Sequence, residues 1–176
     1  MSDLSKISSQ DIANAIGGLC FSKITLAINA GGAATVRSTG AIDYTVGGVY
    51  STKAALSAQA ITVTHRFDGK PVTVADPAYV QPINTTVIYV LALNAAGTVA
   101  VVQGTYAGQQ ITYGSDLSKI VTAGGGVPNL PAGYTAIGAI KVVTNGVATF
   151  TAGTTALDAA GLTVTYSDLA LLPVSL

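Results

Sequence analysis

Apolar and polar residues alternate along most of the chain after residue 20. Ile24, Leu26 and Ile28 are each separated by one intervening residue, a spacing typical of a strand with one buried face. The same alternation recurs in short stretches bounded by glycine, proline or asparagine. We therefore expect an all-β body with about ten short strands, folded as an antiparallel β-sandwich, a jelly roll or a barrel rather than an α/β sheet.

Turn residues arrange these strands into hairpins. The tightest predicted hairpin has Gly47-Gly48 at its tip, because two glycines readily adopt the positive φ angles of a two-residue turn. A longer one has its turn at 94–97. The pair Asn145-Gly146 predicts that 147–151 folds back on a long strand at 134–144.

Four further segments belong to the predicted body. Residues 61–67 are predicted to form a strand, 68–71 a turn, and 162–166 a last strand. The glycine- and proline-rich stretch 123–133 is predicted to be a loop, or a hinge between two halves of the body.

The first twenty residues follow a different pattern. Ser8 or Ser9 can begin a short helix and Gly17-Gly18 can end it, so 1–20 is predicted to be an N-terminal helical arm and 21–176 the body. A helix this short needs a surface to pack on, which can be this body, a neighbouring copy or another protein. The apolar positions of the arm, and thus the candidate docking residues, are Leu4, Ile7, Ile12, Ile16 and Leu19.

The chain is almost without charge, and this excludes several classes of partner. Charged residues make up 9% of its 176 residues, where soluble domains average about 25%, and the formal net charge is zero. With only two arginines, Arg37 and Arg66, it cannot form the basic surface that nucleic acids require. No apolar stretch is long enough to span a bilayer as a helix, and no secretory signal is expected.

The scarcity of charge also predicts association. A surface of Thr, Ser, Gly, Ala and Asn can be buried against a partner without desolvating ions. We therefore expect a homo-oligomer or a larger assembly, the alternative being a monomer that tolerates an uncharged surface. The eight tyrosines fit either core packing or such interfaces.

The chain has few residues of the types that catalytic sites use. The chain has one histidine, His65, one cysteine, Cys20, and no glutamate, while its eight aspartates are scattered singly. Such a composition predicts neither a catalytic constellation nor a zinc site. We therefore expect a protein that is not an enzyme and has no cofactor or metal.

Three phrases of the sequence resemble proteins of tailed-bacteriophage virions, of the capsid decoration, cement or head-fibre kind. They are 93–99 (LNAAGTV), 131–142 (PAGYTAIGAIKV) and 150–161 (FTAGTTALDAAG), within a resemblance that covers mainly 85–168. The resemblance implies a β-rich accessory protein, often trimeric, made in the host cytoplasm and bound to the outer capsid surface. There it would stabilise subunits of the major capsid protein, attached through an N-terminal arm such as 1–20.

A second interpretation stays open. The body can instead be a module of a head or tail fibre that binds a host receptor or glycan through exposed Tyr and Asn side chains. An enzyme acting on a polysaccharide is a weaker alternative, because no pair of neighbouring carboxylates is evident.

Overall fold

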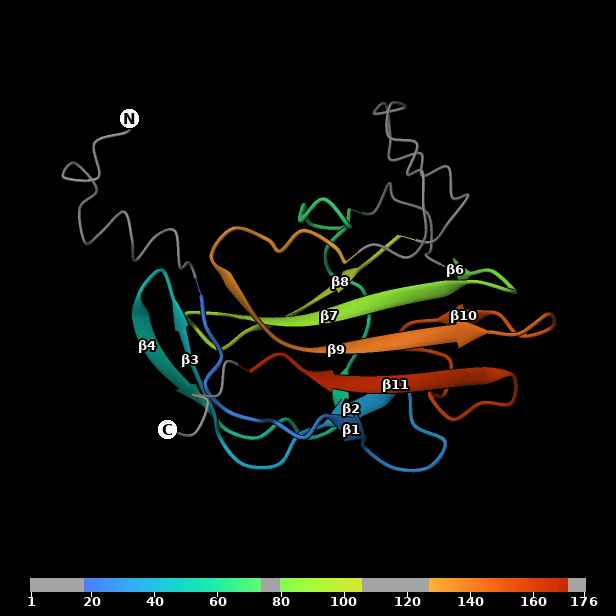
Figure 1. Ribbon diagram of the computed structural model, residues 1–176, viewed down its shortest axis with the longest axis horizontal. Coiled ribbons are helices and arrows are strands. Elements are labelled where there is room, and N and C mark those ends of the chain that lie inside the picture. Colours follow the sequence, from blue (N-terminus) through green and yellow to red (C-terminus); the bar gives the residue numbers. More distant parts are fainter. Residues whose placement is uncertain (1–17, 74–79, 106–126, 171–176) are drawn as a thin grey trace, which may run out of the picture.

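The computed structural model describes residues 18–73, 80–105 and 127–170 (Figure 1). Across these residues the chain forms antiparallel strands and turns and no helix, which confirms the predicted all-β class. The strands are β1 (Ala27–Ile28), β2 (Thr35–Arg37), β3 (Ile42–Val46), β4 (Val49–Lys53), β5 (Gln59–Ala60), β6 (Val80–Gln81), β7 (Thr86–Asn94), β8 (Val99–Gln103), β9 (Tyr134–Thr144), β10 (Phe150–Thr151) and β11 (Leu162–Asp168).

The largest sheet has four strands in the order β11-β9-β7-β8. Every neighbouring pair is antiparallel, and Figure 1 shows β7, β9 and β11 side by side across the molecule. A register shift between Leu91 and Ala92 marks a bulge where β7 meets β9. Of the two outermost strands, β8 is hydrogen-bonded to residues 64 and 65, whereas β11 has no further strand beside it among the described residues.

Three smaller sheets complete the described body: β1-β2-β5, β10-β6 and the hairpin β3-β4. Their apolar side chains pack with one face of the large sheet into a single core, an arrangement consistent with a β-sandwich. The aromatic rings of Tyr89 on β7 and Phe150 on β10 meet edge to face, with centroids 5.6 Å apart. The largest fully buried apolar side chains are those of Tyr44, Tyr89, Phe150, Ile24, Ile42, Ile61, Leu91, Leu93, Ile137 and Ile140.

A buried glutamine ties β6 to the large sheet. The amide Nε2 of Gln81 donates to the carbonyl oxygens of Thr85 (3.1 Å) and Val142 (3.0 Å), and its Oε1 accepts from the Tyr89 hydroxyl at 3.2 Å. Because each polar end of this side chain has a partner, its burial does not carry the cost of an unpaired amide.

Most of the predicted hairpins are present. Gly47 and Gly48 have φ angles of 57° and 79° and connect β3 to β4, and Gly97 at φ 75° lies in the turn between β7 and β8. The predicted long strand at 134–144 is β9, and the predicted last strand is β11. Local turn chemistry and period-two patterning were sufficient for these elements.

The prediction that Asn145-Gly146 folds 147–151 back on β9 was wrong. Asn145 does make a turn, since its Oδ1 accepts from the N–H groups of Val147 (3.0 Å) and Ala148 (2.8 Å). However, β9 already has β7 and β11 as its neighbours, and β10 pairs with β6 instead. The turn signal was correct, but it does not determine which strand the outgoing chain joins.

Two other predicted segments are described only in part. Of the predicted arm 1–20, only 18–20 lies within the described residues, and of the predicted loop 123–133 only 127–133. The division into an arm and a body therefore stays a prediction. No helix among the described residues is long and apolar enough to cross a membrane.

Candidate functional site

The point where the predicted arm leaves the body is held against β3. The N–H of Leu19 donates to Thr45 Oγ1 at 3.1 Å, and the N–H of Thr45 donates to the Leu19 carbonyl at 2.8 Å. One step further on, the N–H of Phe21 donates to the Asp43 carbonyl at 2.8 Å. These bonds continue the β3-β4 hairpin by a short extended segment, so the chain enters the body in a defined direction.

Gly18 reinforces this attachment because no other residue fits there. A Cβ at position 18 would collide with the side chain of Thr135 and with the carbonyl of Thr45. The Thr135 hydroxyl also donates a short hydrogen bond to that same carbonyl. The root of the arm, defined as residues 18–21, is thus packed between β3 and β9.

Only one of the candidate docking residues falls within the described part of the chain. Leu19 is half-buried at the root. Leu4, Ile7, Ile12 and Ile16 lie outside the described residues. Their role in docking stays a prediction.

The hairpin β3-β4 carries a carboxylate surrounded by hydroxyl donors. Asp43 Oδ1 accepts from Tyr50 Oη (2.8 Å) and Thr52 Oγ1 (2.9 Å), and Ser22 Oγ lies 3.4 Å from Oδ2. These bonds, that from Tyr50 foremost, lower the pKa of Asp43 below its ordinary value. A carboxylate held ionised in this way is a poor general acid, and we assign it to the structure of the hairpin.

One aromatic and one aliphatic side chain are exposed on the same hairpin, both at the start of β4. Tyr50 is 62% exposed and Val49 is 63% exposed. The sequence does not single out this cluster, because the alternation of β3 and β4 gives Asp43, Tyr50 and Thr52 no special spacing. Only their cross-strand register, with Asp43 opposite Thr52, brings them together.

His65 and Cys20, the residues with the most reactive side chains, lie in surroundings that indicate structural roles. Thr64 Oγ1 lies 3.0 Å from His65 Nδ1, the ring of His65 meets that of Tyr134 edge to face, and burial lowers the pKa of the imidazole. Cys20 is buried, and burial raises the pKa of its thiol. The described residues contain no group of three or more His, Cys or acidic side chains placed to hold a metal.

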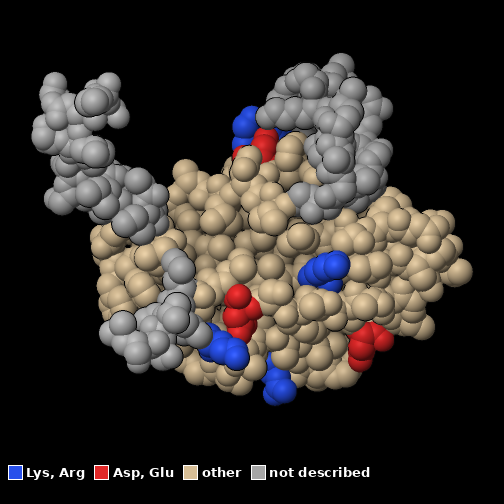
Figure 2. Space-filling view, in the orientation of Figure 1, with Lys and Arg blue, Asp and Glu red and all other residues tan. Residues whose placement is uncertain are grey.

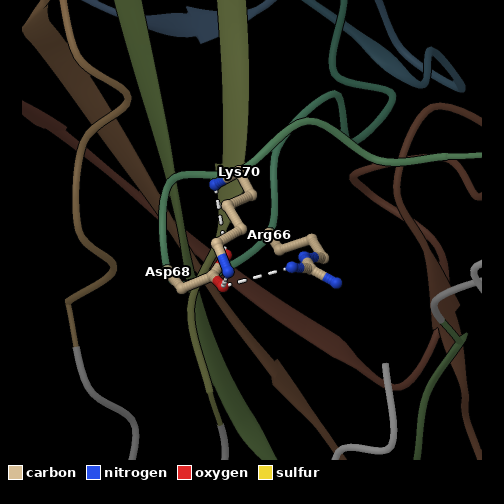
Figure 3. A network of polar contacts seen from close by, with 3 residues as sticks. All are labelled: Arg66, Asp68 and Lys70. Carbon is tan, nitrogen blue, oxygen red and sulfur yellow. Dashed lines mark hydrogen bonds and ion pairs between the residues drawn. The ribbon is translucent and has the colours of Figure 1, made fainter. Parts of the chain in front are cut away.

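The charged side chains include one compact network, in the turn at 66–70. Asp68 lies between two cations, with its Oδ2 3.2 Å from Arg66 Nη2 and 3.7 Å from Lys70 Nζ (Figure 3). Its Oδ1 accepts the backbone N–H of Lys70 at 3.1 Å. Gly69, at φ 80°, allows the chain to reverse at this point, which confirms the predicted turn at 68–71.

The face of the large sheet that points away from the core carries little charge. Figure 2 shows only a few scattered charged residues on this side of the molecule. On β11 the exposed side chains are Thr163, Thr165 and Ser167, and on β9 the exposed side chain is Lys141. Small polar residues therefore dominate this face along β11, whereas the outward residues of β7 and β8, such as Val90 and Val102, are apolar and buried.

Comparison of the chain with protein-family models, with curated proteins and with solved structures found no match.

Proposed function

We propose that the protein is a capsid decoration, or cement, protein of a tailed bacteriophage, which binds the outer surface of the head and stabilises the major capsid subunits. The observation that carries this proposal is the combination of a sparsely charged β body with an N-terminal segment that has spaced apolar positions and a root packed between β3 and β9. A body of this kind can cover protein surface without desolvating ions. The anchored root would transmit load between an arm held on the shell and the body.

The resemblance of 85–168 to virion accessory proteins supplies the identity of the partner. It suggests the major capsid protein as the target, the virion as the location and a homo-oligomer, with a trimer favoured. Many modest contacts repeated over symmetric copies give strong attachment even where each contact is weak.

Binding to shells is the direct test. Purified protein is mixed with expanded capsids that lack it, the mixture is co-sedimented, and the loaded shells are then challenged by heat or denaturant. We expect saturable binding at a fixed ratio to capsid subunits and shells that survive harsher conditions. Absence of binding would contradict the proposal, and binding without added shell stability would reduce it to decoration alone.

The role of the arm is tested by a deletion that respects the structure. Removing 1–17 leaves Gly18, Leu19 and their contacts with Thr45 and Thr135 in place, so the body should keep its fold. Shell occupancy should fall at least tenfold. The matched control changes polar arm positions only, with Ser5, Gln10 and Asn14 replaced by Ala, and should bind as the wild type does.

The second candidate function is a fibre module that binds a receptor or glycan. The exposed Tyr50 and Val49 on the β3-β4 hairpin favour it, because aromatic side chains stack on sugars and pack in interfaces. Tyr50→Ser would then abolish binding to host cells while leaving shell binding intact. Under the cement proposal, the same variant should leave both shell occupancy and shell stability unchanged.

A further inference from the structure

One edge of the large sheet has backbone groups without a partner among the described residues. In β11 the residues Thr163, Thr165 and Ser167 pair with β9, and Leu169, in phase with them, donates its N–H to the Ile137 carbonyl at 3.1 Å. The alternate residues Leu162, Val164 and Tyr166 must direct their N–H and C=O groups to the opposite side, away from the sheet. Accordingly, the N–H of Leu162 bonds with the Ala159 carbonyl, outside the sheet.

The outward groups of Val164 and Tyr166 have no hydrogen-bond partner among the described residues. The open side ends at Asp168, whose carboxylate accepts the N–H groups of Thr25 and Leu26, each at 3.0 Å. The open edge is therefore the segment 162–166.

The features by which natural proteins prevent further strands from pairing with such an edge are largely missing here. Open edges are usually short, charged, interrupted by proline or bulged. Residues 162–166 read Leu-Thr-Val-Thr-Tyr, with no charge, no proline and a regular ladder to β9. All of these except the leucine are β-branched or aromatic types that favour extended structure. The edge is suited to accept another strand.

The sequence of the edge points to a second copy of the same chain as its occupant. Leu-Thr-Val-Thr-Tyr is nearly symmetric about Val164, with threonine on either side and a large apolar residue at each end. Two such strands related by a two-fold axis at Val164 would place Thr163 opposite Thr165 and Leu162 opposite Tyr166. An interface with two-fold symmetry requires this kind of self-complementarity.

We propose that two copies of the protein associate through β11, with the strands antiparallel and centred on Val164, so that their large sheets join into one. Each Val164 N–H donates to the Val164 carbonyl of the other copy. Each Tyr166 N–H donates to the Leu162 carbonyl of the other copy. Threonine pairs form the outer face of the junction and Leu-Tyr pairs continue the inner face.

The charge of Lys141 does not oppose this contact. Lys141 lies opposite Thr165 on β9, one strand away from the edge. Its counterpart in the second copy would lie about 15 Å away, since strands are spaced by roughly 4.8 Å and the two copies are offset along the strand. Repulsion over that distance is largely screened at physiological ionic strength.

A two-fold contact cannot by itself close a trimer, so it adds to the trimer that the resemblance suggests rather than explaining it. The inference does not depend on the proposed function, and its test uses the purified full chain without capsids. If one proposal fails its experiment, the other is still decided by its own experiment.

The test adds charge to the exposed face of the edge. In T163K/T165K, each new lysine faces a lysine of the other copy, while no buried side chain changes. In T163E/T165K, each glutamate faces a lysine instead. The control T98K/T154K adds the same charge to two exposed threonines in turns away from β11.

Light scattering after size exclusion, at micromolar concentration, should give T163K/T165K half the mass of the wild type. T163E/T165K and T98K/T154K should keep the wild-type mass. A wild type that is a monomer or a trimer, or an assembly whose mass T163K/T165K leaves unchanged, would overturn the proposal.

Amide hydrogen exchange identifies the occupant. The amides of Val164 and Tyr166 should be protected in the wild type and exchange at least tenfold faster in T163K/T165K. If these amides are protected equally in both proteins, another segment of the chain covers the edge and the proposal is wrong.

Discussion

The two outer strands of the large sheet have opposite surroundings. Beyond β8, the chain returns and satisfies the edge: the N–H groups of Thr64 and His65 donate to the Val101 carbonyl, and the N–H of Gln103 donates to the His65 carbonyl. Beyond β11, no described segment pairs with Val164 or Tyr166. Within the part of the chain that the structure describes, one sheet thus has a closed edge and an open edge.

The closed edge also carries the charge that the open edge lacks. The segment that covers β8 continues directly into the turn of Arg66, Asp68 and Lys70 (Figure 3). In a chain with 9% charged residues, three of them gather beside one edge while 162–166 has none. Within the described residues, the backbone of β8 is thus satisfied next to a charge network, whereas the outward groups of Val164 and Tyr166 are available for pairing.

The largest effect is expected from loosening the turn at 66–70, which follows the segment that covers β8. In Gly69→Ala, the new Cβ would lie 2.8 Å from the Leu130 carbonyl oxygen, and the residue would keep a φ of 80°. The strained backbone and the clash together should lower the free energy of unfolding by about 2–3 kcal/mol, measured by urea denaturation.

Gly40→Ala is the matched control for that variant. Gly40 has a φ of 73°, and a Cβ added there would have no atom within 4 Å, so the loss should be about 1 kcal/mol. Equal losses in the two variants would contradict the role of the contact with Leu130.

A smaller effect is expected from removing one hydroxyl at the closed edge. Thr64 Oγ1 accepts the N–H of Val101 at 2.9 Å, so Thr64→Val leaves that donor without its partner. We expect a loss of about 1 kcal/mol and faster hydrogen exchange at Val101. Thr62→Val, on an exposed neighbour whose hydroxyl makes no hydrogen bond among the described residues, should change stability by less than about 0.5 kcal/mol.

Acid should weaken the closed edge slightly. Burial opposes ionisation of Asp68, but the backbone N–H of Lys70 and the charges of Arg66 and Lys70 together hold its pKa below the ordinary value. Because the folded pKa is the lower one, the stabilisation is present above about pH 4 and is lost as the pH falls through the folded value.

This loss should be about 1 kcal/mol, because Lys70 is exposed to solvent while the side chains of Arg66 and Asp68 are only 13% and 11% exposed. Urea denaturation between pH 5 and pH 2 should show it as a difference between the wild type and Asp68→Asn, which lacks the titrating group. Parallel pH profiles for the two proteins would show that the network contributes nothing.

The smallest effect is expected at the open edge. Thr163→Lys adds a charge to an exposed side chain of β11 whose partner on β9 is the uncharged Val143, so in a single copy no like charge lies directly opposite it. The free energy of unfolding, measured at a concentration low enough to separate copies, should change by less than about 0.5 kcal/mol. A larger loss would mean that 162–166 packs against another part of its own chain.

The same pair of edges shows what sequence patterning can and cannot predict. The strand at 162–166 was predicted from its alternation, but its position at the edge was not. Residues 61–67 were predicted as a strand, yet they join β8 only through Thr64 and His65 and are otherwise irregular. Patterns of period two indicate that a segment is extended and do not say what it pairs with.

The candidate site divides in the same way. Leu19 and Gly18 were visible in the sequence as the end of an apolar segment, but the contacts that hold them, Thr45 and Thr135, lie far along the chain. The cluster around Asp43 was missed because its members are joined only by the register of β3 and β4.

The sequence by itself determined the all-β class, the glycine turns, the long strand β9 and the scarcity of charge, because each depends on neighbours within a few residues or on composition alone. Only the tertiary structure decided that β10 pairs with β6 rather than β9, that Gln81 is buried with its partners, and which edge of the sheet is open among the described residues. These outcomes depend on contacts between segments distant along the chain, where burial of the whole core, and not local preference, selects the pairing.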